Sequence, residues 1–209
     1  MPELAELGIR RGKRAMAKAA NRRAILDAAR VVFARIGYDA ACIRDIIRQT
    51  SLASGTFYNY FKSKEEVFEA ISDDSVKRFR PLLQQVREEA GDLESYLFGA
   101  YGAYFHFLAN ENEQALKDGA PHLALIGVRV DTPEMKTLFE EIHSDLQMVI
   151  MKMGHDQIDT DYLAAAAIGI AREMGDHMLQ RRPPDADHAA RFATQIIITS
   201  IEALANEGS

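Results

Sequence analysis

The stretch that decides the fold is CIRDIIRQTSLASGTFYNYFKSK, residues 42–64. Its first part places isoleucines at positions 43, 46 and 47, the spacing of one apolar face of a helix. A polar break follows at residues 50–53, and Ser54 is a favourable residue to cap the next helix because its hydroxyl can accept a free backbone N–H. The pattern predicts two short helices joined by a tight turn.

The second of these helices is predicted over residues 55–61. Phe57 and Phe61, four positions apart, are expected to point inward. The opposite face is polar and consists of Thr56, Tyr58, Asn59 and Tyr60. Ser63 is followed three positions later by Glu66, a capping box that predicts the start of a third helix.

Two short helices, the second with a polar outer face, are typical of a helix-turn-helix motif, whose second helix enters the DNA major groove. The pattern alone fits an ordinary helical hairpin equally well. Over residues 21–70, however, the sequence resembles the N-terminal domain of the tetracycline-repressor (TetR) family of bacterial transcription regulators. The resemblance rests on ILDAA at 25–29, FARIGY at 33–38, IRDI at 43–46 and, above all, SGTFYNYFKSKE at 54–65.

The resemblance implies DNA contacts from Arg44 on the first motif helix, from the start and outer face of the recognition helix, and from the start of the following helix. Carried over by position, the remaining contacts are Ser54, Gly55, Thr56, Tyr58, Asn59, Tyr60 and Lys64. Lys64 is expected to hold a phosphate. The chain departs from the family pattern at Cys42, where Thr or Ser is usual, and at Asn59, where His is common.

The charge distribution agrees with a DNA-binding end. Residues 1–64 carry 13 Lys and Arg against 5 Asp and Glu, a net charge of +8, whereas residues 65–209 carry a net charge of −14. A basic end on an acidic body suggests that one end meets a polyanion. A merely solvated basic tail, the simpler explanation, would give the same asymmetry.

The body is predicted to be helical. Helices are expected over residues 21–37 and 63–89, the latter kinked or interrupted at Pro81, then over 92–110, 122–130, 133–153, 160–180 and 186–205. Six of the 17 aromatic residues lie between positions 96 and 107, interleaved with glycine and alanine. Such a run makes either an aromatic core or a ligand cavity. The residues expected to bind a ligand are Tyr101, Tyr104, Phe105, Phe139 and His143.

The last helix has a wide apolar arc, which suggests that it is buried on two sides. In TetR-like proteins the last two long helices pair with their copies in a dimer. The resemblance therefore implies a homodimer, and the interface residues expected are Ala167, Ile170, Met174, Ile197, Ile201 and Leu204.

Several classes of function lack support in the sequence. No nucleophile elbow, P-loop, dinucleotide fingerprint or zinc motif occurs, so we expect no enzyme, cofactor or metal. One cysteine, no long apolar run and no secretory signal together predict a cytoplasmic protein with no membrane partner.

We therefore predict an all-α protein. A basic arm (1–20) precedes a three-helix helix-turn-helix domain (21–66) and a helical ligand-binding and dimerisation domain (67–209). The expected function is a repressor that binds double-stranded operator DNA as a dimer and is released by an apolar or amphipathic small molecule. The alternatives are a DNA-binding regulator controlled by a protein partner and, with less support, a small-molecule enzyme.

Overall fold

The computed structural model describes residues 2–117 and 132–207, and every regular element among them is an α-helix. The helices are α1 (Pro2–Ile36), α2 (Ile43–Arg48), α3 (Ser54–Phe57), α4 (Lys64–Glu89), α5 (Leu93–Lys117), α6 (Pro133–Lys152), α7 (Thr160–Gln180) and α8 (Ala186–Glu207). The all-α prediction is confirmed. The helix expected at residues 122–130 lies outside the described residues.

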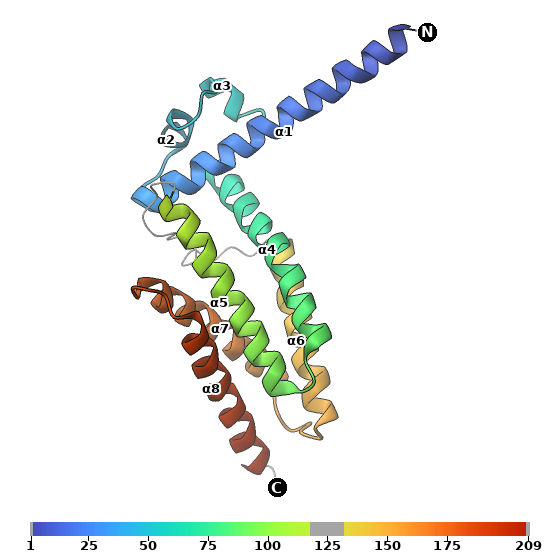
Figure 1. Ribbon diagram of the computed structural model, residues 1–209, viewed down its shortest axis with the longest axis vertical. Helices are drawn as coiled ribbons and strands as arrows, with labels where there is room; N and C mark the ends of the chain where they lie inside the picture. The colour runs from blue at the N-terminus through green and yellow to red at the C-terminus, as the bar shows by residue number, and fades with distance from the viewer. Residues whose placement is uncertain (1, 118–131, 208–209) are drawn as a thin grey trace.

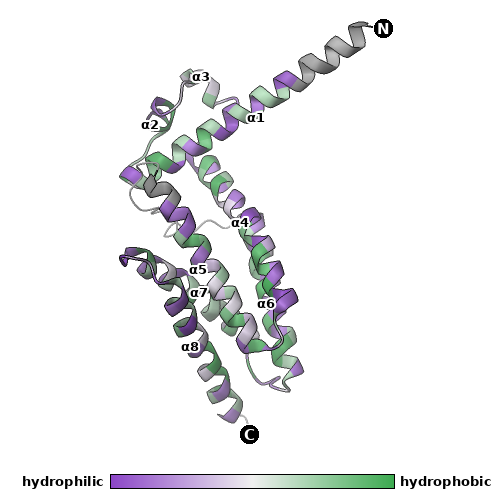
Figure 2. Cartoon of the chain, viewed as in Figure 1, coloured by the Kyte–Doolittle hydropathy of each residue, from purple (hydrophilic) through white to green (hydrophobic). Residues whose placement is uncertain are grey.

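Figure 1 shows α4 to α8 packed side by side as an elongated bundle. The helix α1 crosses one end of this bundle, and its N-terminal half projects away from it, while α2 and α3 lie beside α1. Hydrophobic and hydrophilic residues alternate along the bundle helices, as expected for helices with one buried face (Figure 2).

The first helix differs from the prediction. Because α1 begins at Pro2, the arm expected at residues 1–20 continues the helix. Asn21 therefore lies inside α1 and does not cap a helix start; its Nδ2 donates a hydrogen bond to the hydroxyl of Tyr60 at 3.2 Å. The predicted end is confirmed: Gly37 follows the last turn with a φ of 81°, a conformation that glycine adopts without strain.

The helix α4 begins and ends as predicted, but it is not interrupted. Ser63 caps it, with its hydroxyl accepting the backbone N–H of Glu66 at 3.3 Å. Pro81 does not interrupt the helix, which continues to Glu89.

Buried hydrophobic side chains form two clusters, and α4 contributes to both. The N-terminal cluster joins α1, α2, α3 and the first two turns of α4, and it includes Val67, Phe68 and Ile71. The second cluster begins at Val76 and includes the apolar faces of α5 to α8. A domain boundary after residue 66 would therefore cut through the first cluster.

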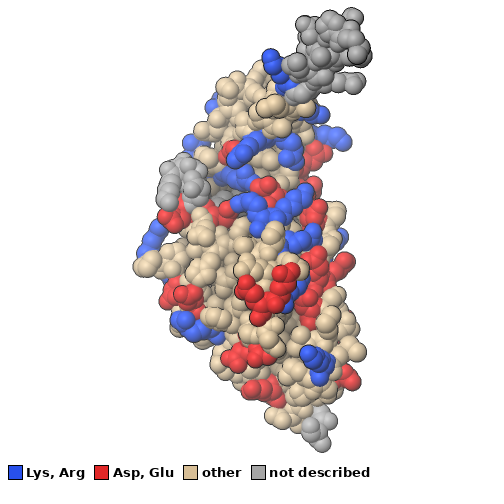
Figure 3. Space-filling model, turned by 45° about the vertical axis from the view of Figure 1, so that its right-hand side comes forward, with Lys and Arg blue, Asp and Glu red and all other residues tan. Residues whose placement is uncertain are grey.

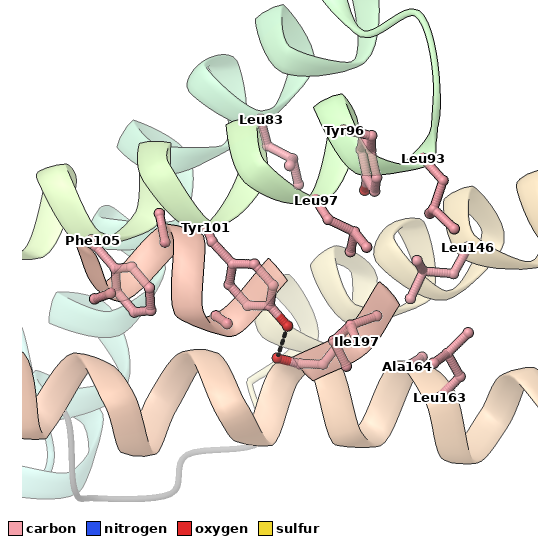
Figure 4. Packing of buried hydrophobic residues seen from close by; sticks show 14 of the residues in the cluster. Leu83, Leu93, Tyr96, Leu97, Tyr101, Phe105, Leu146, Leu163, Ala164 and Ile197 are labelled. Atoms are coloured by element: carbon pink, nitrogen blue, oxygen red, sulfur yellow. Dashed lines mark hydrogen bonds between the residues drawn. The ribbon is translucent and has the colours of Figure 1, made fainter. Parts of the chain in front are cut away.

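The helix α5 lies at the centre of the second cluster. A Cβ atom on Gly99 would lie 2.8 Å from a methyl group of Val86 on α4, so the glycine allows these two helices to approach closely. Tyr101 is buried, and its hydroxyl donates a hydrogen bond to the carbonyl of Ala167 on α7 at 3.1 Å (Figure 4). Part of the aromatic run thus builds the core, which was the simpler of the two predictions.

Candidate functional site

The helix pair at the N-terminal end is held by buried aromatic side chains. Phe57 is fully buried and Phe61 is 4% exposed, as the sequence predicted. The turn between α2 and α3 is closed by Thr50, whose hydroxyl donates to the carbonyl of Ile47 at 2.9 Å and accepts the N–H of Leu52 at 3.2 Å. These contacts fix the direction in which α3 leaves α2.

The second motif helix is shorter than predicted. It ends at Phe57, and residues 58–60 form a hydrogen-bonded turn in which the N–H of Tyr60 donates to the carbonyl of Phe57 at 2.9 Å. Ala53 occupies the N-cap position, so Ser54 is the first helical residue and not the cap. The apolar face is nevertheless buried as predicted, since Phe57 and Phe61 both belong to the N-terminal cluster.

Most of the residues expected to contact DNA are accessible. Arg44, Ser54, Gly55, Tyr58 and Asn59 are exposed, whereas Thr56 and Tyr60 are half-buried. Arg44 forms no ion pair with any other described residue. On the face drawn in Figure 3, Lys and Arg gather mainly in the upper half, toward α1, and Asp and Glu prevail below. The DNA contacts expected from Arg44 and from the second motif helix remain predictions.

Lys64 is bound by the protein itself. Its ammonium group donates hydrogen bonds to the carbonyls of Tyr38, Asp39 and Ala41 at 2.9, 3.2 and 3.1 Å, and it lies 4.6 Å from the centre of the Tyr38 ring. The Tyr38 hydroxyl donates to Glu65 at 3.1 Å. Burial, followed by this hydrogen bond, raises the pKa of Tyr38 to about 12. Lys64 therefore ties the loop after α1 to the start of α4, and the expected phosphate contact is untested.

A cavity of about 460 Å³ lies in the bundle between α4, α5, α6 and α7 and extends to α1. Of the residues expected to bind a ligand, Tyr101, Tyr104 and Phe139 line it. Phe105 does not, because its ring is fully buried in the core against Tyr101. His143 does not either, because its Nε2 lies 2.9 Å from Asp161 at the start of α7.

The cavity wall is apolar at one end and polar at the other. The end far from α1 is lined by Leu83, Leu97, Leu138 and Leu146. The end nearest α1 has polar side chains, which the sequence analysis did not single out: Arg30, Ser72, Ser75, Glu111 and Asn112. The cavity therefore suits a molecule with an apolar part and a polar part.

Two of the cavity tyrosines have their hydroxyl groups engaged by the protein. Tyr101 donates to Ala167, and Tyr96 donates to Asp145 at 2.7 Å. The Tyr104 hydroxyl has no hydrogen-bond partner among the described residues, and burial raises its pKa to about 12. Tyr104 thus presents a neutral hydroxyl group at neutral pH.

A chain of ion pairs connects the polar end of the cavity to the N-terminal helices. Arg30 on α1 donates to Asp74 on α4 at 2.6 Å, Arg78 lies 3.3 Å from the same carboxylate, and Arg78 also donates to Glu111 on α5 at 2.8 Å. Arg30 and Glu111 both line the cavity. The sequence analysis did not identify these ion pairs, because their residues are far apart along the sequence.

The N-terminal part of the chain also matches a known family. Residues 25–71 match the family described as bacterial regulatory proteins, tetR family. They include α2, α3 and the buried Phe57, so the matched segment coincides with the helix pair described above. This N-terminal segment is thus similar to the TetR family.

The chain is similar to a curated receptor protein and to a curated transcriptional repressor. It is 34% identical over 93 residues to the A-factor receptor protein of Streptomyces griseus, a match that covers 44% of this chain and 31% of that protein. It is 27% identical over 149 residues to the HTH-type transcriptional repressor KstR2 of Rhodococcus jostii, covering 69% of this chain and 72% of the repressor. The first match thus spans about a third of its relative's length.

A solved structure shares the fold of most of the chain. The transcriptional regulator FadR from Bacillus subtilis, in complex with stearoyl-CoA, superposes with a TM-score of 0.67 at 19% identity, over 84% of this chain and 96% of FadR. At this identity the likeness concerns the fold alone.

The burial of residues on α7 and α8 corrects part of the predicted interface. Ala167, Ile197 and Ile201 are each at most 6% exposed and belong to the chain's own core, so they do not face outward. Ile170 and Met174 are half-buried against the same core, whereas Leu204 is 45% exposed. Large apolar side chains that do face outward on these helices are Tyr162, Phe192 and Ile196.

Metal and membrane binding have no structural support in the part of the chain that is described. No group of three or more His, Cys, Asp or Glu side chains is arranged to hold a metal ion among residues 2–117 and 132–207. Within the same residues, no helix is long and apolar enough to span a membrane.

Proposed function

We propose that this protein is a member of the TetR family and a ligand-responsive repressor that binds a near-palindromic operator as a homodimer. An apolar or amphipathic small molecule would release it from DNA. The observation that carries the proposal is the cavity of about 460 Å³, which lies in the bundle and reaches α1 of the DNA-binding end. A protein that only needed a scaffold for its reading helices would gain nothing from this void, because empty space in a core is destabilising.

The cavity is placed where a ligand can act on the reading helices. The helix α4 lines it with Ser72, Val76 and Phe79, and the same helix packs in the N-terminal cluster through Val67 and Phe68. A ligand that moves α4 therefore also moves the cluster that holds α3. For release, the ligand must bind the DNA-free arrangement more tightly than the DNA-bound one. A tenfold loss of operator affinity needs a difference of about 1.4 kcal/mol.

The DNA contacts would come from the exposed residues of the helix pair. Asn59, Tyr58 and Arg44 are accessible for contacts with bases or phosphates, and the net charge of +8 on residues 1–64 favours a polyanion. Because DNA is the target, the protein would act in the cytoplasm. Two recognition helices in a dimer would read half-sites separated by about 34–36 Å or a multiple of it.

The dimer would form through the outer face of α7 and α8. Tyr162 is 77% exposed and Phe192 is 56% exposed, and Ile196 and Leu204 extend the same apolar surface on α8. Single exposed apolar residues are ordinary, but a row of them along one helix is typical of an interface. The interface proposed here is thus centred on these four residues.

The test combines an operator with a ligand screen. An operator is first selected from random duplex DNA, and the protein–DNA complex is then challenged with apolar and amphipathic molecules in a fluorescence-anisotropy assay. We expect ligands that raise the melting temperature of the free protein to release the DNA. Ala171 lines the cavity, so Ala171→Phe should abolish the response and leave operator binding intact.

The screen also separates the alternatives. A regulator controlled by a protein partner would bind the operator and respond to no small molecule. An enzyme would convert the bound molecule, and product analysis of the same mixtures would show this. The relatives named above are a receptor protein and a transcriptional repressor, which supports the regulatory proposal.

A further inference from the structure

The cavity extends along α5. Its wall includes α5 residues from Tyr96 to Asn112, which are sixteen positions and therefore roughly 24 Å apart along the helix. An extended apolar chain would follow this wall from the leucine-lined end to Asn112.

The polar end of the cavity contains an amide that has no partner. Asn112 is 5% exposed and lines the cavity, and its Oδ1 forms no hydrogen bond with any residue that the structure describes. Buried polar groups in native proteins are nearly always hydrogen-bonded, so an exception on a cavity wall indicates a partner supplied from outside. Either orientation of the amide leaves one group to be satisfied there.

The charges around Asn112 are already paired. The guanidinium groups of Arg30 and Arg78 face the carboxylates of Asp27, Asp74 and Glu111, so the group carries a net charge of −1. Among the described side chains, an incoming carboxylate or phosphate would find no unpaired cation here, and it would add a like charge beside Glu111. A buried anion without a counter-charge is unfavourable.

The remaining cation on the cavity wall lies elsewhere. Arg172 is on α7, and both it and Asp176 act electrostatically on Tyr104, which is two helical turns away from Asn112 along α5. Because a carboxylate accompanies Arg172 at Tyr104, this position also offers no lone positive charge.

We propose that the end of the cavity beside Asn112 binds the uncharged head group of a single-chain amphiphile, an alcohol or a primary amide. The apolar chain lies between α4, α5 and α6, and Asn112 is the residue that selects a neutral head over an anionic one. Ser72 and Ser75, which line the same end, supply further hydroxyl groups. This inference rests on the proposed ligand cavity and specifies the class of ligand.

The experiment compares two probes with the same chain, 1-decanol and decanoate, by isothermal titration calorimetry at pH 8 and below their aggregation limits. We expect 1-decanol to bind at least tenfold more tightly than decanoate. Asn112→Leu should weaken binding of 1-decanol about fivefold, the value of one hydrogen bond, and change decanoate binding less than twofold. Asn110→Leu, an exposed position on the same helix, should change neither.

A second readout tests the unpaired amide without ligand. Replacing an unsatisfied buried amide by an apolar group of similar size should raise the melting temperature of the free protein, whereas a satisfied amide would make Asn112→Leu lower it. A lower melting temperature, decanoate binding as tightly as 1-decanol, or unchanged 1-decanol affinity in Asn112→Leu would each overturn the head-group assignment.

Failure of the proposed function has a different outcome. If neither decyl probe binds but another screened molecule releases the operator, the head-group assignment is wrong and the ligand-responsive repressor stands. If no molecule in the screen binds the protein or releases it from DNA, both proposals are wrong.

Discussion

Lys64 offers a direct test of whether a basic residue in the motif binds DNA or stabilises the fold. Lys64→Met keeps the length of the side chain and removes the ammonium group, which donates to three carbonyls at 2.9–3.2 Å. One hydrogen bond from a charged group contributes about 1.5–3 kcal/mol. Because Lys64 is half-buried and its three bonds share one charge, we expect the substitution to lower the free energy of unfolding by about 2 kcal/mol in total.

The assay measures stability and salt dependence on the same samples. Urea unfolding gives the change in stability, and operator affinity at several salt concentrations gives the number of phosphate contacts. A residue that contacts one phosphate contributes about 0.9 to the slope of log K against log salt. We expect Lys64→Met to leave this slope unchanged, since its ammonium group is occupied by carbonyls.

Lys62 provides the matched control, because it is two residues away, exposed, and forms no ion pair with the other described residues. Lys62→Met should change the free energy of unfolding by no more than about 0.5 kcal/mol. The reasoning is refuted if Lys64→Met unfolds at the wild-type urea concentration while the salt slope falls by about one unit. In that case Lys64 leaves its carbonyls on binding DNA, as the resemblance to the family implies.

Three further predictions concern packing, assembly and pH. Gly99→Ala should destabilise the protein by about 1 kcal/mol, since the new methyl meets Val86 at 2.8 Å; Gly102→Ala meets nothing within 4 Å and should stabilise it by up to about 1 kcal/mol in the same urea titration. Phe192→Glu should turn a dimer into monomers in light scattering and weaken operator binding, and an unchanged dimer would contradict the interface proposed on α8. Stability should fall as the pH rises from about 10 to about 12, because an unfolded tyrosine loses its proton near pH 10 while Tyr104, like Tyr38, keeps its proton until about 12; Tyr104→Phe should make this fall smaller by the contribution of one tyrosine.

The local pattern of the sequence predicted the helices well where local interactions decide them. The capping of α4 by Ser63, the end of α1 at Gly37 and the burial of Phe57 follow from spacing and residue type, and all three are confirmed. The length of α3 was wrong. The helix has only four residues, and the packing of Phe57 and Phe61 in the N-terminal cluster holds it in place. The sequence pattern alone could not show that the helix ends at Phe57, because this packing is tertiary.

The interface and the cavity were predicted less well, because both depend on which face of a helix meets which neighbour. An apolar residue on α8 is equally suited to the core or to a partner, and Ile197 and Ile201 belong to the core. His143 and Phe105 lie near the predicted cavity in sequence, but their side chains point elsewhere. Asn112 was missed because a single asparagine in a polar stretch carries no signal until its burial is known.

The ion pairs beside the cavity explain how occupation of the polar end can reach the DNA-binding end. Arg30 belongs to α1, whose residues pack against α2, whereas its partner Asp74 lies on α4 and shares Arg78 with Glu111 of α5. Each of these side chains is partly exposed, so each pair contributes little to stability by itself. Weak pairs exchange partners at small cost, which suits a contact that must differ between two arrangements. A head group beside Asn112 would therefore act on α1 through Arg30 as well as through α4, and the two routes differ in their salt dependence, since only the ion pairs are screened.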